Sequence, residues 1–215
     1  MKAGIIGSGI VGRVLASALL KEGNEVILGT RNTAKEEVVK WQMENPGGSV
    51  GTFDEAASFG ELIILATKGT VAEDTVRLAG PANFTGKTVI DTTNPIAAAP
   101  PVNGVLQYFT SPNQSLMESL QELLPEAHLV KAFNSVGNSQ MYKPDYNGIL
   151  PTMFICGNND SAKKTVTSIL TVFGWETEDL GKIEAARAIE PLAMLWCIPG
   201  MLNNLWTHAF KLLKH

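Results

Sequence analysis

A glycine-rich turn near the start of the chain has the residue types and spacing that can hold a diphosphate group. The segment Gly7-Ser8-Gly9-Ile10-Val11-Gly12 carries glycine at its first, third and sixth positions, directly after a short apolar run. The first glycine of such a turn permits a tight bend, the second lets a phosphate approach the backbone, and the third lets a helix pack closely on the strand. The free N–H groups of that helix favour an anion. We therefore expect these six residues to bind the pyrophosphate of a dinucleotide.

A second group of residues indicates which dinucleotide is bound. In NAD sites, an acidic residue at the end of the second strand accepts hydrogen bonds from the ribose hydroxyls. Here the positions after the second apolar run are Thr30, Arg31, Asn32 and Lys35, and none of them is a carboxylate. Arg31 can offer a planar fork to a 2′-phosphate, Thr30 a hydroxyl and Lys35 a point charge. These residues predict NADP(H); the alternative is that Arg31 and Lys35 are simply solvated at a helix start.

The remaining cofactor contacts are expected at the ends of later strands, which face the same groove in a doubly wound sheet. The residues at these ends are Ala66, Thr67, Lys68, Asn94, Ala132 and Asn134. Their backbone and polar side-chain groups are placed to reach ribose and nicotinamide. Thr67 and Asn94 also suit ordinary turns, so turn chemistry is the alternative explanation for them.

Acid–base machinery is sparse in this sequence. The chain has three histidines, His128, His208 and His215. The first begins a buried-looking strand, the second lies in an amphipathic tail and the third ends the chain, so a structural or solvated role is favoured for each. Lys68 and Lys131, near expected strand ends, are the remaining candidate acids. The catalytic residue therefore stays unassigned, and no metal-ligand spacing is present.

Short apolar runs alternate with helical patterns along the chain, which predicts a parallel sheet covered on both faces. The expected strands are 3–6, 25–28, 49–51, 62–66, 88–91, 128–132, 152–156 and 176–180. The expected helices begin at Ile10 and otherwise cover 34–44, 71–79, 116–124 and 161–173, with a brief helix capped by Asp54 and apolar helices after Leu180. The prediction is an α/β, Rossmann-type, doubly wound and mostly parallel sheet. Residues 1–181 form the NADP(H)-binding domain, and 182–215 form a small helical C-terminal extension packed on it.

Composition excludes several other classes of protein. The 215 residues are 45% apolar and 18% charged, with a formal net charge of −4, so no basic face favours nucleic acid. Cys156 and Cys197 lie far apart and fit free thiols in a reducing compartment. The N-terminus lacks the pattern of a secretory signal, and the apolar region 192–213 is interrupted by Pro199 and Gly200. We expect a cytoplasmic protein with no membrane partner.

The chain resembles the NADPH:coenzyme F-420 oxidoreductase family, and it is also similar to the cytosolic domain of the STEAP metalloreductases. The matching stretches are Gly7–Gly12, Gly29–Asn32, Val89–Pro95, Lys131–Asn134, Glu184–Arg187 and Glu190–Trp196. The resemblance implies a compact Rossmann domain with a small C-terminal extension, often assembled as a homodimer. It also implies a hydride passed between NADPH and a small-molecule acceptor, which is the deazaflavin F-420 in the namesake family and a flavin in the metalloreductases.

The lack of an acid–base pair fits hydride transfer between two rings, because such a reaction mainly requires positioning. The acceptor would lie beside the proline-rich loop 94–112 and the C-terminal helices. Candidate lining residues are Tyr108, Phe109, Met194, Trp196, Met201 and Trp206. The alternative for this stripe is core or dimer interface.

Two other functions stay open at this point. One is a non-catalytic NADP(H)-binding redox sensor, which would also lack acid–base residues. The other is a reductase of a small imine or carbonyl substrate. Enzymes of that kind with this Rossmann half add a substantial helical domain, and the region after Leu180 is too short for a full version of it.

Overall fold

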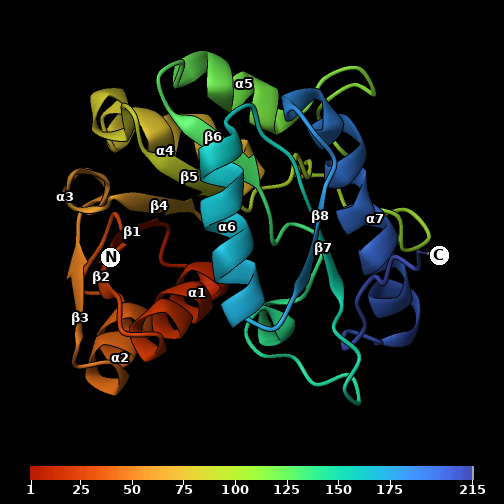
Figure 1. The fold of residues 1–215 in the computed structure, drawn as a ribbon, viewed down its shortest axis with the longest axis horizontal. Helices are drawn as coiled ribbons and strands as arrows, with labels where there is room; N and C mark the ends of the chain where they lie inside the picture. The colour runs from red at the N-terminus through yellow and green to blue at the C-terminus, as the bar shows by residue number, and fades with distance from the viewer. Residues whose placement is uncertain (215) are drawn as a thin grey trace.

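The computed structural model describes residues 1–214; His215, the third histidine considered above, lies outside them. Within the described residues, six strands form one parallel sheet in the order β3-β2-β1-β4-β5-β6 (Figure 1). Their bounds are β1 Lys2–Ile6, β2 Glu25–Gly29, β3 Gly48–Gly51, β4 Leu62–Leu65, β5 Thr88–Asp91 and β6 His128–Lys131. The strand order reverses direction at β1 and β4, which places a crevice at their carboxyl ends.

Helices cover both faces of this sheet. Their bounds are α1 Ile10–Lys21, α2 Glu36–Glu44, α3 Phe53–Phe59, α4 Ala72–Leu78, α5 Leu116–Leu123, α6 Asp160–Val172 and α7 Ala186–Asn203. One buried cluster joins α1, α2 and α6 to the sheet, and a second joins α3, α4, α5 and the start of α7 to the opposite face. The predicted doubly wound, mostly parallel Rossmann-type fold is therefore confirmed.

Local sequence explains where two of the helices begin and end. Helix α1 stops because Gly23 adopts a left-handed conformation (φ 77°), and the N–H groups of Gly23 and Asn24 bond back to the last turn. Helix α3 begins after Thr52, whose hydroxyl accepts from the Glu55 N–H while the Glu55 carboxylate accepts from the Thr52 N–H. The expected cap at Asp54 is therefore wrong, because Asp54 already lies in the first turn.

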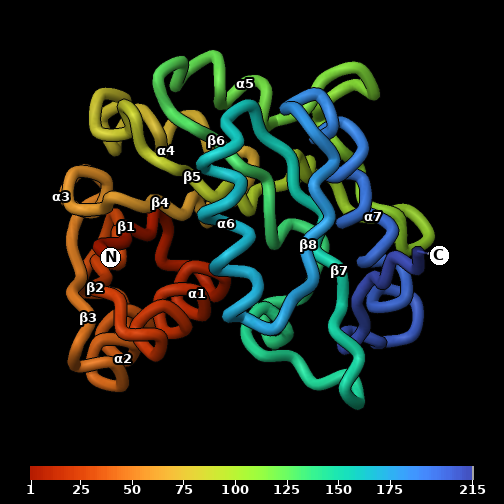
Figure 2. The backbone as a smooth tube through the Cα atoms, in the orientation of Figure 1, coloured from red at the N-terminus to blue at the C-terminus, as the bar shows by residue number. Residues whose placement is uncertain are grey.

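Strands β7 (Thr152–Ile155) and β8 (Glu176–Asp179) form a separate parallel pair joined through α6. A single antiparallel bridge between Lys131 and Cys156 connects this pair to the end of β6. Figure 2 shows the pair and α7 on the side of the molecule away from β2 and β3. The strands themselves were expected, but their separation from the main sheet was not.

The C-terminal extension contains one long helix followed by an irregular tail. Helix α7 contains Pro191 and Pro199 and ends at Asn203, and the next residue, Asn204, is left-handed (φ 55°). The tail then folds back, and the Trp206 ring lies 5.7 Å from the Trp196 ring. Within residues 1–214, none of the helices combines the length and apolar composition that crossing a membrane requires.

Candidate functional site

The glycine turn after β1 has the geometry that its sequence predicts. Gly7 is left-handed (φ 126°), and a Cβ there would lie 2.3 Å from the carbonyl oxygen of Ala66. A Cβ on Gly12 would lie 1.8 Å from the carbonyl oxygen of Gly7, so this position holds α1 against the turn. A Cβ on Gly9 would meet no atom within 4 Å. Protein packing therefore explains Gly7 and Gly12, whereas Gly9 keeps an open approach to the helix N-terminus, as a bound phosphate requires.

A cleft of about 730 Å³ lies at this turn, along the carboxyl ends of β1, β2, β4 and β5. The predicted residues that line it are Gly7, Ser8, Gly9, Ile10, Val11, Thr30, Arg31, Lys35, Ala66, Thr67 and Lys68. The structure thus brings together, in one cleft, segments that are far apart in the sequence. Its volume falls in the range of about 300–1,000 Å³ that small-molecule sites occupy.

At the β2 end of the cleft, some side chains form hydrogen bonds within the turn, and others are exposed cations. Thr30 is only 3% exposed, and its hydroxyl accepts hydrogen bonds from Ser8 Oγ at 2.8 Å and the Asn32 N–H at 3.3 Å. Asn32 Oδ1 in turn accepts from the N–H of Ala34. Thr30 and Asn32 therefore shape the turn, while the exposed Arg31 and Lys35 line the cleft. The described residues lining the cleft include three cations, Arg31, Lys35 and Lys68, and no carboxylate; Arg31 and Lys35 are the two at the β2 end.

Several lining residues carried no clear sequence signal. Phe53, Thr70, Val71 and Thr75 also border the cleft, as does Thr92 from the expected end of β5. Helix starts such as those of α3 and α4 are the only hint that these side chains would face it. The Thr67 hydroxyl is buried and has no hydrogen-bond partner in residues 1–214. A bound ligand with a polar group would satisfy this oxygen.

The predicted contacts from the ends of β5 and β6, Asn94, Ala132 and Asn134, are not among the residues that line the cleft. The Asn94 side chain donates to the carbonyl oxygen of Asn134 at 2.7 Å, and the Asn134 amide donates back to Asn94 Oδ1 at 3.1 Å. Ala132 has no exposed surface, and Asn134 is 5% exposed. Between them, Phe133 is buried and left-handed (φ 61°), which turns the chain toward Asn94. This amide pair joins the ends of β5 and β6.

Lys131 is buried at the centre of an ion cluster. Its ammonium nitrogen lies 2.6 Å from Asp91 Oδ2 and 2.8 Å from Glu190 Oε1, and it donates to the carbonyl oxygen of Thr93 at 2.9 Å. All three N–H groups of the ammonium are therefore used. Burial alone would lower the pKa of Lys131, but the two carboxylates raise it above its ordinary value. Lys131 is thus a structural cation with no route to a substrate, so its candidacy as an acid is wrong.

Glu190 connects α7 to the rest of this cluster. Its carboxylate accepts from the N–H groups of Leu116 and Met117, both at 3.0 Å, at the start of α5. The Glu190 carbonyl oxygen accepts from the Tyr108 hydroxyl at 2.8 Å. Burial and the charge of Glu190 raise the pKa of Tyr108 far above its ordinary value. One residue thereby fixes α7, α5 and the loop 94–112 to the strand ends.

The aromatic residues expected beside an acceptor differ in burial and in packing. Trp196 is 7% exposed and stacks on His208, whose ring nitrogen pairs with the Trp196 carbonyl oxygen. Trp206 packs on the same side, so Trp196 belongs to the core, which was the alternative explanation. Phe109 is 48% exposed and borders a second cavity.

Burial raises the pKa of the Cys156 thiol to about 12, so this thiol is not reactive.

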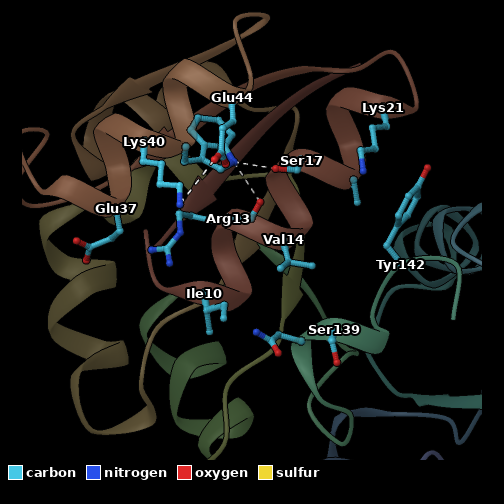
Figure 3. Close-up of a pocket in the computed structure, with 13 residues that line it drawn as sticks. Ile10, Arg13, Val14, Ser17, Lys21, Glu37, Lys40, Glu44, Ser139 and Tyr142 are labelled. Carbon is cyan, nitrogen blue, oxygen red and sulfur yellow. Dashed lines mark hydrogen bonds and ion pairs between the residues drawn. The ribbon is translucent and has the colours of Figure 1, made fainter. Parts of the chain in front are cut away.

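Figure 3 shows another cavity, of about 560 Å³, on the outer side of α1. Trp41 is one of its lining residues and donates from Nε1 to Ser17 Oγ at 2.8 Å and to the Arg13 carbonyl oxygen at 3.2 Å. Ile10 borders both this cavity and the cleft. Because the two linings share no other residue, this cavity is separate from the cleft.

The fold and cleft define a Rossmann-type dinucleotide-binding protein, and comparisons narrow the class. Residues 2–95 match the family described as NADP oxidoreductase coenzyme F420-dependent. Metalloreductase STEAP3 of Rattus norvegicus is 31% identical over 206 residues, which is 94% of this chain but 39% of that protein. The resemblance predicted from the sequence is confirmed. The chain thus spans about two fifths of the curated relative that it matches.

Solved structures agree with this class. A candidate F420-dependent NADP-reductase from Arthrobacter sp. FB24 is 29% identical, with a TM-score of 0.90 and 99% of both chains covered. A reductive aminase from Aspergillus terreus, solved with NADPH, is 20% identical with a TM-score of 0.67, covering 94% of this chain and 63% of that one. The second likeness shows the fold alone. The matching family and these structures are described as NADP-dependent reductases or as enzymes solved with NADPH, and this agrees with the class predicted from the sequence.

Proposed function

We propose that the protein is an NADP-dependent oxidoreductase that transfers a hydride between NADP(H) and a flavin-like acceptor, either the deazaflavin F-420 or a flavin. The observation that carries this proposal is the cleft that joins the glycine turn to Arg31 and Lys35. The open approach at Gly9 suits a pyrophosphate, and the two cations suit a 2′-phosphate. The matching family and the Arthrobacter structure are described as F420-dependent NADP reductases, and the curated relative is named a metalloreductase.

The chain's own residues would bind, orient and shield the cofactor. Backbone N–H groups from Gly9 onward would hold the diphosphate, and the Thr67 hydroxyl is available to a polar group within the cleft. When bound, NADPH supplies a hydride from C4 of its ring, and the acceptor ring takes that hydride together with one proton from water. The Asn94–Asn134 pair would keep the strand ends fixed at the nicotinamide end.

Ring-to-ring transfer is supported because two of the candidate acids are held by the protein itself, whereas Lys68 stays exposed on the cleft wall as the remaining candidate. Lys131 is closed off by its three partners, and His208 is held by the Trp196 carbonyl oxygen. Hydride transfer between two stacked rings depends mainly on their placement. A homodimer and a cytoplasmic location remain part of this proposal, with a small molecule as the partner rather than nucleic acid or membrane.

The test is to mix the purified protein with NADPH and follow the absorbance of the reduced nicotinamide without oxygen. F-420, FMN, FAD and a ferric chelate are added separately, and NADH replaces NADPH as the control. Oxidation of NADPH by F-420 or a flavin, with little oxidation of NADH, is the expected result. Tight NADPH binding without oxidation by any of them would overturn the proposal in favour of a redox sensor.

A further inference from the structure

Arg13 lies behind the glycine turn rather than in the cofactor cleft. It is the fourth residue of α1 and comes directly after Gly12. Its half-buried side chain lines the outer cavity beside Lys40 and Glu37 (Figure 3). It is not among the residues that line the cleft. Arg13 can therefore influence a bound cofactor through the turn, without contacting it.

The guanidinium of Arg13 holds one peptide group of that turn. Arg13 Nη1 donates to the Ser8 carbonyl oxygen at 2.7 Å, a short bond of the kind that a charged donor makes. The side chain of the same serine is also fixed, since Ser8 Oγ donates to Thr30 Oγ1 at 2.8 Å. Ser8 is thus held from two sides, which restricts rotation of the peptide group that joins it to Gly9.

The bonded carbonyl group determines where the next N–H group points. The Ser8–Gly9 peptide is trans, and in a trans peptide the C=O and N–H bonds point in opposite directions. Because the carbonyl faces Arg13, the Gly9 N–H faces away from Arg13, and Gly9 lines the cleft. Among residues 1–214 this N–H has no hydrogen-bond acceptor. It is therefore a free donor at the position where the diphosphate is expected.

The first turn of α1 carries a charge opposite to the one that a helix start favours. Helices α2 to α6 each place at least one carboxylate in their first turn, and α1 has none. Arg13 instead brings a cation to the positive end of the helix dipole. Glu37 and Glu44 line the outer cavity together with Lys21 and Lys40, but Arg13 has no ion pair among residues 1–214. This charge disfavours the helix itself and favours an anion bound at the turn.

We infer that Arg13 is a positioning residue for the cofactor: it orients and polarises the Ser8–Gly9 peptide so that the Gly9 N–H donates to the diphosphate. This inference rests on the NADP(H) binding of the proposed function, and it is independent of the hydride acceptor. A hydrogen bond to the carbonyl strengthens the N–H of the same peptide as a donor, by about 10–30%. Because NADPH and NADH share the diphosphate, Arg13 serves both cofactors, unlike Arg31 at the 2′-phosphate.

Two nucleotide fragments test the inference without any turnover. ADP carries a diphosphate and no 2′-phosphate, whereas 2′-AMP carries a 2′-phosphate and no diphosphate. Competition with NADPH, followed by nicotinamide fluorescence, measures the affinity of each. Arg13→Met should weaken the binding of ADP, NADPH and NADH by about fivefold to tenfold and leave 2′-AMP unchanged. Equal losses for ADP and 2′-AMP, or an unchanged affinity for ADP, would overturn the inference.

Two further substitutions locate the effect at the Ser8 carbonyl oxygen. Lys21→Met is the matched control, since it removes a cation that lines the same cavity at the other end of α1, and it should leave the affinity for ADP unchanged. Arg13→Lys keeps the charge and a donor, so it should regain most of the affinity that Arg13→Met loses. Equal losses in Lys21→Met and Arg13→Met, or no recovery in Arg13→Lys, would overturn the inference.

Urea unfolding separates positioning from a structural role. The midpoint of Arg13→Met should equal or exceed that of the parent protein, because a cation leaves the start of a helix. A lower midpoint with unchanged binding of ADP would make Arg13 structural and overturn the inference. The two proposals also fail differently. NADPH that binds through Arg13 but is not oxidised would overturn the reductase function alone, whereas NADPH oxidation with ADP binding that is independent of Arg13 would overturn the positioning role alone.

Discussion

The ammonium of Lys131 and the carboxylate of Asp91 meet at 2.6 Å, and neither side chain has any exposed surface. They sit at the carboxyl ends of two neighbouring strands, β6 and β5, just below the turn that holds Asn94. Glu190 adds a second carboxylate from α7, so the cluster carries an excess negative charge. The N–H groups at the start of α5 offset this charge. The strand ends and the C-terminal helix are thereby locked into one unit.

Lys131→Met should lower the free energy of unfolding by about 3–5 kcal/mol, because it leaves two buried carboxylates without their cation. Urea unfolding followed by tryptophan fluorescence measures the change. Lys143→Met is the control, since it breaks the exposed pair between Lys143 and Glu22 and should leave the midpoint close to that of the parent protein. Similar losses in both variants would contradict the central role of the Lys131 cluster.

The same lysine predicts how stability changes in alkali. The pKa of Lys131 in the folded protein is raised above its ordinary value of 10.5, since the two carboxylates outweigh the effect of burial. The folded protein therefore keeps a proton that the unfolded chain has lost, so stability falls as pH rises through the folded pKa. As the pH rises above about 10.5, the urea midpoint should decline more steeply in the parent protein than in Lys131→Met, whereas below that pH the two should change in parallel. Parallel declines would show that other groups cause the alkaline loss.

Much of the fold follows from local sequence, because each strand and helix has its own periodicity. The glycine turn and the free cations at Arg31 and Lys35 were also predictable, since their chemistry is read from neighbouring residues. The Lys131 cluster was not, because its partners Asp91 and Glu190 come from distant segments and only the fold brings them together. The separation of β7 and β8 from the main sheet likewise depends on which strands pair with each other, and the residue pattern within one strand does not determine its partner.

Two glycines of the same turn should respond differently to alanine. Gly9 has an ordinary backbone conformation (φ −66°), and its Cβ would enter open space. Gly9→Ala should therefore fold normally but bind NADPH about tenfold more weakly, a loss of about 1.4 kcal/mol. Gly12→Ala forces its Cβ to 1.8 Å from the Gly7 carbonyl oxygen, so it should cost about 1–3 kcal/mol of stability. Unfolding and NADPH titrations of both variants check the contrast, and a Gly9→Ala protein that binds normally would contradict it.

Arg31 provides the test of cofactor choice. Its side chain is exposed in the cleft, whereas the neighbouring Thr30 hydroxyl is already bonded to Ser8 and Asn32. Arg31→Ala should weaken NADPH binding about tenfold or more, the size of a lost hydrogen bond to a charged group, while NADH binding is unchanged. Arg77→Ala is the control, because it removes an exposed arginine that pairs with Glu73 outside the cleft. Titrations by nicotinamide fluorescence compare the two cofactors. An equal loss for NADPH and NADH would show that Arg31 does not contact the 2′-phosphate.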